Sequence, residues 1–198
     1  EVLMHVRMLD PLRLQQQETL GILGVNLLYA CHSLTGDGSK FVSSLLENLS
    51  QDRIEIDYIK FCGKDLKHID NRLMSLELVK QEIAEAVMFD AEGSPLCPSD
   101  FLYGKNPIVQ RGTFRPVTNV NIEISKRGLE QLHRDIKGKK SDGISIMEIT
   151  MGGLTQSGKV NDQDFLNRVD TLGSTGQTVM VSNFNLYAEV CEYLLKKT

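Results

Sequence analysis

The stretch QRGTFRPVTNVNIEIS, residues 110–125, combines the residue types from which proteins build phosphate-binding turns. A short apolar strand leads into Gly112, and a helical pattern begins after Thr118. Glycine allows a tight turn, and the free amides and positive dipole end of a helix N-terminus attract phosphate. Two arginines would neutralise an anion, while the glycine and the amides at the helix start would cradle it. The candidate ligand-binding residues are Arg111, Gly112, Phe114, Arg115, Thr118, Asn119 and Asn121.

This stretch resembles the turn of the nucleotidylyltransferase superfamily, above all of phosphopantetheine and nicotinate or nicotinamide mononucleotide adenylyltransferases. Their signature reads G-x-F-x-P-x-T/H-x-G-H and lies between a strand and a helix. Four residues match it in type and spacing: Gly112, Phe114, Pro116 and Thr118. The resemblance implies a Rossmann-like domain and, in an active member, transfer of a nucleotidyl group to a mononucleotide such as nicotinamide mononucleotide.

The match ends at the positions that carry catalysis in the superfamily. The Gly-His pair lets backbone approach the triphosphate and supplies an imidazole for the charge that develops during transfer; here that pair is Val120-Asn121. The superfamily's late phosphate loop with its arginine has no counterpart either. We therefore expect no catalytic residue, and a turn that binds a nucleotide or other phosphate-bearing small molecule. Two alternatives stay open: a working nucleotidyltransferase, and a strand–helix turn with a structural role only.

Two further stretches are partial matches to phosphate chemistry. AVMFDAEGSPL, residues 86–96, resembles the first motif of haloacid-dehalogenase-like phosphatases, but Glu92 replaces its second aspartate. GLTQSGKV, residues 153–160, resembles a phosphate-binding loop whose Mg²⁺-binding Ser or Thr is replaced by Val160. We expect a hairpin turn with Gly93 at positive φ in the first case, and a glycine-rich loop in the second.

Composition sets the broad class. The 198 residues are 41% hydrophobic and 24% charged with a net charge of −4, which favours a globular domain and disfavours nonspecific nucleic-acid binding. The basic cluster 137–140 is expected to be a solvated loop. The four cysteines form no CxxC pair, which favours reduced thiols and predicts neither a metal nor a cofactor. The apolar run 20–31 is too short to span a membrane, and we expect a cytoplasmic protein, or a stromal one if the source is a photosynthetic eukaryote.

Strand and helix patterns alternate from residue 54 onward, which predicts an α/β fold. We expect a three-layer domain with a mainly parallel sheet and helices on both faces over residues 51–198, where ligands would bind at the carboxyl ends of the strands. A helical segment over residues 1–50 would pack on this core, giving a single domain overall. Its first helix, which Asp10 would cap, contains Gly21 and Gly24, whose small size would admit a partner. A structural interaction module or homo-oligomer is therefore a further alternative.

Several segments together resemble an uncharacterised family of bacterial and plastid-lineage proteins. The segments are RLQQQETLGILGVNLLYA, DNRLMSLELV, PSDFLYGKN, RGTFRPVTNVN and DFLNRVDTL with GQTVMVSN. Members of this family are described variously as nicotinamide mononucleotide adenylyltransferases and as TonB-dependent receptors. The resemblance implies that this chain is the carboxy-terminal portion of a longer protein.

Overall fold

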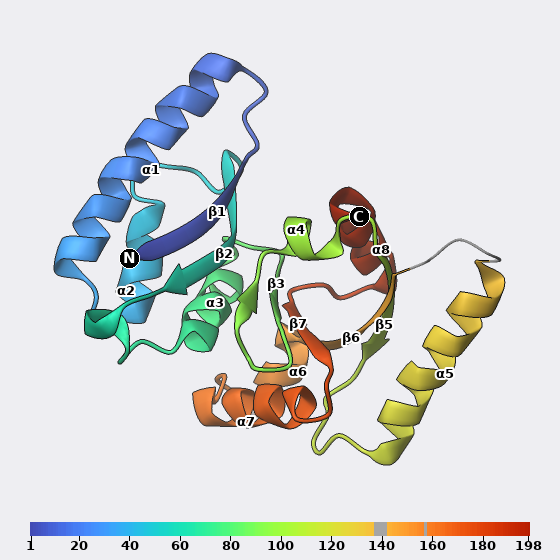
Figure 1. The fold of residues 1–198 in the computed structure, drawn as a ribbon. Helices are drawn as coiled ribbons and strands as arrows, with labels where there is room; N and C mark the ends of the chain where they lie inside the picture. Colours follow the sequence, from blue (N-terminus) through green and yellow to red (C-terminus); the bar gives the residue numbers. More distant parts are fainter. Residues whose placement is uncertain (137–141, 157) are drawn as a thin grey trace. The chain divides into compact units, whose positions relative to one another are not determined.

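The computed structural model describes residues 1–136, 142–156 and 158–198 (Figure 1). The basic cluster 137–140 lies outside the described residues. Contacts divide the chain into two compact units, unit 1 (Glu1–Val87) and unit 2 (Met88–Thr198). Each unit has its own sheet, of two strands in the first case and five in the second.

Unit 1 is a two-stranded antiparallel ribbon with helices packed beside it (Figure 1). Its elements are β1 (Val2–Met8), α1 (Arg13–Ser33), α2 (Gly38–Leu45), β2 (Ile54–Phe61), η1 (Lys64–Leu66) and α3 (Asn71–Lys80). α3 packs on β2, and α2 contacts both α1 and α3. The four-residue spacing of Phe41, Leu45 and Leu49 predicts a buried helix face. All three side chains are buried, but α2 ends at Leu45, so Leu49 lies beyond the helix.

The start of unit 1 differs from the expectation in two ways. β1 was not expected in a helical segment, and it pairs with β2 rather than leaving β2 to join the larger sheet. Asp10 was expected to cap the first helix, and this was wrong, because the N-cap is Leu12. The buried Asp10 carboxylate instead accepts hydrogen bonds from Thr19 Oγ1 (2.7 Å) and Arg53 Nε (3.1 Å), which tie the helix to the residue before β2.

Unit 2 is built on a five-stranded sheet with the order β4-β3-β7-β6-β5. Its strands are β3 (Ala86–Phe89), which begins two residues before the unit boundary, β4 (Pro95–Leu96), β5 (Asn106–Arg111), β6 (Gly143–Thr150) and β7 (Thr178–Ser182). Its helices are α4 (Pro98–Leu102), α5 (Asn119–Asp135), α6 (Met151–Thr155), α7 (Asp162–Gly173) and α8 (Tyr187–Lys197). β5, β6 and β7 run parallel, whereas β3 and β4 form an antiparallel hairpin.

The α/β class expected from the sequence is confirmed, with a mixed five-stranded sheet and helices. The hairpin expected at 86–96 is also confirmed, and Gly93 has a φ of +77° as its turn requires. β7 is buried through most of its length and β6 through its second half, so this sheet carries much of the unit's core. All four cysteines are free thiols. No helix among the described residues is both long and apolar enough to cross a membrane.

Candidate functional site

The Arg111–Asn121 turn joins the carboxyl end of β5 to the start of α5. β5 lies at the edge of the sheet and is parallel to β6, with Arg111 opposite Glu148. The Gly112 amide continues the ladder by donating to the Glu148 carbonyl at 3.0 Å. The turn thus leaves the sheet at the carboxyl end of a strand, and parallel α/β sheets bind their ligands at these strand ends.

Arg111 is held inside unit 2. Its Nε and Nη2 donate to the two carboxylate oxygens of Glu148 at 2.8 and 2.9 Å, and Nη1 donates to the Asn185 carbonyl at 2.9 Å. The guanidinium also lies 4.7 Å from the centre of the Tyr187 ring. Hydrogen bonds to Glu148 raise the pKa of Arg111 above its ordinary value. Three of the five guanidinium donors are therefore committed before any ligand arrives.

Glu148 explains why Arg111 is held there. Its side chain is fully buried on β6 and also accepts a hydrogen bond from Ser182 Oγ on β7 at 2.6 Å. A buried carboxylate must be paired and hydrogen-bonded, because its desolvation otherwise costs several kcal/mol. Arg111 is therefore first of all the counter-ion of Glu148, and it links the three parallel strands at their carboxyl ends.

Gly112 and Phe114 form the packed base of the turn. A Cβ added to Gly112 would lie 3.0 Å from two ring atoms of Phe114, so the glycine makes room for that ring. Phe114 is 5% exposed and has a φ of +47°, a left-handed conformation that a phenylalanine rarely adopts. The ring is thus part of the core, and it is not presented to a ligand.

Arg115 and Arg168 share one carboxylate. Arg115 donates to Asp164 Oδ1 through Nε (3.0 Å) and Nη2 (2.8 Å), while Arg168 Nη2 pairs with Oδ2 of the same aspartate. Arg168 Nη1 also donates to the Thr113 carbonyl at 3.1 Å. Burial raises the pKa of Asp164, but hydrogen bonds from the two arginines outweigh it and hold that pKa below its ordinary value. Two positive charges and one negative charge leave a surplus of one positive charge beside the turn.

The two arginines of this cluster differ in exposure. The Arg115 side chain is 47% exposed, and its Nη1 donates no hydrogen bond to any other described residue. The Arg168 side chain is only 3% exposed, and its buried Nε also has no partner among the described residues. Arg115 is therefore the arginine of the turn that can reach a dissolved anion, with Arg168 adding charge beneath it.

Thr118 and Asn121 close the N-terminus of α5 on itself. Asn121 Oδ1 accepts from the Thr118 amide at 2.9 Å and from Thr118 Oγ1 at 2.8 Å, which is the returning half of a capping box. The amides of Asn119 and Val120, in contrast, donate no hydrogen bond within the described part of the chain. The first turn of α5 also carries no acidic residue. The structure thus gives Asn121 a capping role.

Asp164 and Arg168 were not among the candidates from the sequence. Their four-residue spacing on an amphipathic helix indicates that they can pair with each other. Only the fold brings them to a turn some fifty residues earlier in the chain. No local signal in the sequence could have shown this contact.

Of the two partial matches, the first forms a hairpin turn, as expected. The second was expected to be a glycine-rich loop over residues 153–160, and this is wrong at its start, because residues 153–155 belong to α6. Asp90 Oδ1 accepts from the amides of Glu92 (3.0 Å) and Ser94 (2.7 Å), so the aspartate stabilises the β3–β4 hairpin. At the second motif, Thr150 Oγ1 accepts from the Gly153 amide at 3.0 Å at the start of α6. Gly158 follows at a φ of +111°, and Ser157 lies outside the described residues. Both contacts are the ones that local turn chemistry requires.

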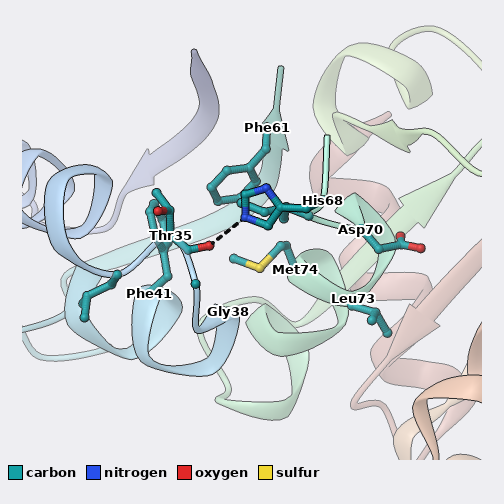
Figure 2. A pocket seen from close by; sticks show the side chains of 11 residues that line it. Thr35, Gly38, Phe41, Phe61, His68, Asp70, Leu73 and Met74 are labelled. Atoms are coloured by element: carbon teal, nitrogen blue, oxygen red, sulfur yellow. Dashed lines mark hydrogen bonds between the residues drawn. The ribbon is translucent and has the colours of Figure 1, made fainter. Parts of the chain in front are cut away.

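Unit 1 contains a pocket that the sequence did not single out (Figure 2). It forms between the α1–α2 loop and the residues before α3. The glycines of the loop sequence Thr35-Gly36-Asp37-Gly38 are typical of a helix–helix connection, and by themselves they predict only a turn.

Comparison with known proteins gives no family for the chain. Neither the family models, the curated proteins nor the solved structures gave a match.

Proposed function

We propose that unit 2 is a non-catalytic binding domain for a phosphate-bearing ligand, such as a nucleotide, and that the ligand binds at the start of α5. The observation that carries the proposal is the surplus positive charge of the Arg115–Asp164–Arg168 cluster. Arg115 lies in the turn that leads to two helix amides, those of Asn119 and Val120, which donate no hydrogen bond within the described residues. Anions are stabilised by helix N-termini through both the free amides and the helix dipole.

The proposal gives the seven candidate residues different tasks. Arg115 would contact the anion directly, and the Asn119 amide would donate to it. Thr118 and Asn121 would hold the helix start in shape, and Gly112 and Phe114 would support the turn from below. Arg111 would act mainly through Glu148 by fixing the carboxyl end of β5.

In this proposal the sheet of unit 2 is mainly parallel, with β3 alongside β7 in the same direction and helices on both faces. Loops that follow β5, β6 and β7 would then open at one edge. The absence of catalysis follows from the residues at the superfamily's Gly-His positions. Val120 is 66% exposed and Asn121 is engaged in the cap, so neither would stabilise charge developing on a transferred phosphoryl group.

The test is calorimetric titration of the whole chain with pyrophosphate and with ATP, each with and without Mg²⁺. Arg115→Ala is expected to weaken binding by about tenfold, the effect of losing one charge-assisted contact. Arg127→Ala is the matched control, because it removes the same charge from an exposed arginine of α5 that pairs with Glu123. Equal weakening in both variants would mean that net charge alone attracts the anion, and it would contradict the proposed site.

A separate assay tests the non-catalytic part. The chain is incubated with ATP, Mg²⁺ and nicotinamide mononucleotide, and pyrophosphate release is followed. We expect none above the rate without protein. Release that is lost in Arg115→Ala would establish a nucleotidyltransferase instead.

A second candidate function is self-association through α1. We define the α1 stripe as Leu14, Gly21, Val25 and Leu28, which share one face of the helix. The three apolar side chains are 67–77% exposed, and a Cβ on Gly21 would meet nothing within 4 Å. Leu14 and Leu28 each lie seven residues from Gly21. An antiparallel second copy on a two-fold axis at Gly21 would therefore place Leu14 against Leu28 of the partner subunit.

Sedimentation velocity of the purified chain tests this candidate. A dimer is expected that Leu28→Glu dissociates and Leu20→Glu does not, because Leu20 is 56% exposed but projects from another side of the helix. A wild-type monomer at the highest soluble concentration, or equal dissociation by both variants, would contradict self-association through this stripe.

A further inference from the structure

The pocket in unit 1 has a volume of about 180 Å³ and is independent of the Arg111–Asn121 turn (Figure 2). Its walls come from the α1–α2 loop, α2, the end of β2 and the start of α3. Two helix caps fix these walls: Asp37 accepts from the Lys40 amide at 3.1 Å, and Asp70 accepts from the Arg72 amide at 2.9 Å. Capped helix starts stabilise loop positions, so the pocket is formed before any ligand binds.

The inner wall is apolar and aromatic. Phe41 and Phe61 meet edge to face, with ring centres 5.0 Å apart and an angle of 71° between planes, and the Met74 thioether lies beside the same space. A third ring could extend this edge-to-face cluster, and sulfur also favours aromatic neighbours. Apolar cavities of about 150 Å³ are large enough for benzene. The pocket therefore fits one six-membered ring with few substituents.

The charges around the pocket are balanced. Asp37 pairs with Lys40 at 3.1 Å, and Asp70 pairs with Arg72 at 2.7 Å. Burial raises the pKa of Asp70, but hydrogen bonds from Arg72 outweigh it and keep the carboxyl ionised. Figure 2 shows that the Asp70 carboxylate points away from His68 and Met74. The one carboxylate in the described lining is thus paired with an arginine, which favours a neutral ligand.

The Thr35 carbonyl at the mouth of the pocket accepts only a long, weak hydrogen bond. His68 Nε2 lies 3.4 Å from the Thr35 carbonyl, as the dashed line in Figure 2 shows. That distance is beyond the usual range for N–H···O hydrogen bonds, so the contact is weak and easily replaced. His68 is exposed and can turn away when another donor approaches. A ligand with an O–H or N–H on the edge of its ring would therefore gain this carbonyl as an acceptor.

We propose that this pocket binds a small neutral aromatic or heteroaromatic ring that carries one hydrogen-bond donor, with the ring against Phe41, Phe61 and Met74 and the donor on the Thr35 carbonyl. Phenol is the simplest probe of this class. Anisole is its matched comparison, because methylation of the oxygen removes the donor and keeps the ring.

The experiment is a titration of the whole chain with each probe, followed through the Met74 methyl signal and the Gly36 amide signal in NMR spectra. A ligand this small is expected to bind with a dissociation constant on the order of 1 mM. Phenol should shift both signals, and anisole should bind about fivefold more weakly or worse. Equal affinity for the two probes, or no shift of either signal at about 20 mM phenol, would overturn the proposal.

Two glycines of unit 1 supply the variant and its control. In Gly38→Ala the new methyl group would lie 2.7 Å from Met74 Sδ, so the thioether must move and the ring space shrinks. Gly24→Ala, on α1 and outside the pocket lining, adds its methyl group to open space. Phenol affinity should fall about tenfold in the first variant and stay within about twofold in the second. Unchanged affinity in Gly38→Ala would place the phenol elsewhere.

His68→Ala gives a test in the opposite direction and leaves the buried wall intact. Without the imidazole the Thr35 carbonyl has no competing donor, so phenol should bind about two- to threefold more tightly. Weaker binding would show that His68 itself holds the ligand, and it would overturn the assigned hydrogen bond.

Discussion

The two arginines of the turn should differ sharply in what they contribute to stability. In Arg111→Met, the fully buried Glu148 carboxylate loses both guanidinium hydrogen bonds, at 2.8 and 2.9 Å, and among the described residues keeps only Ser182 as a donor. Removing one partner of a buried ion pair costs about 3–5 kcal/mol. Arg115→Ala removes an ion pair from a side chain that is 47% exposed, so solvent screening limits its cost to about 0–1 kcal/mol.

Hydrogen exchange of the β6 amides measures this difference within unit 2. β6 lies between β5 and β7, and the amides of Ile146 and Ile149 belong to fully buried residues, so they should exchange only when the sheet opens. Arg111→Met should speed their exchange by about two to nearly four powers of ten, and Arg115→Ala by less than about one.

A second substitution separates the buried charge from the lost contacts. Glu148→Gln introduced together with Arg111→Met removes the unpaired carboxylate and keeps an oxygen for Ser182. The double variant should be more stable than Arg111→Met alone by on the order of 1–2 kcal/mol. The division of tasks between the two arginines is refuted if the stability losses of Arg111→Met and Glu148→Gln simply add in the double variant. It is also refuted if Arg115→Ala speeds β6 exchange as much as Arg111→Met.

Three further outcomes follow from the structure. Gly173→Ala should destabilise unit 2 by about 1–3 kcal/mol, because the new Cβ would lie 2.4 Å from the Ala91 carbonyl oxygen; thermal unfolding checks this. Gly24→Ala should raise the stability of unit 1 by about 0.5–1 kcal/mol in a urea titration, because this helix interior has open space around the glycine. Asp164→Asn should destabilise at neutral pH, and the deficit should shrink as pH falls below 3.8 through the lowered pKa of Asp164, since an acid with a depressed folded-state pKa stabilises only while it is ionised. A deficit that stays constant down to about pH 2 would contradict the ion pair with Arg115.

Local chemistry made part of the fold predictable. Gly93 at positive φ and the α5 start after Thr118 follow from interactions within a few residues, and both were expected. β1 was missed because its partner, β2, lies about fifty residues further along the chain. The role of Asp10 has the same cause, because its ion-pair partner Arg53 is remote in sequence.

The candidate site shows the same division. The residues that build the turn could be identified from their types and spacing, and the structure places them between β5 and α5. Which arginine is free to meet a ligand could not be foreseen, because Glu148 and Asp164 reach the turn only through the sheet and α7. The role of Asn121 could not be foreseen either. The sequence shows it only as a departure from a catalytic pattern, whereas its contacts show that it caps a helix.

The measurement closest to the central claim is a titration of the chain with pyrophosphate, followed by NMR at the amides of Asn119 and Val120. These amides donate to no other described residue, so a bound phosphate should move their proton signals strongly downfield in the wild type. The same shifts should persist in Arg127→Ala and largely disappear in Arg115→Ala. Shifts at other sites only, or shifts that survive Arg115→Ala, would contradict an anion site at the start of α5.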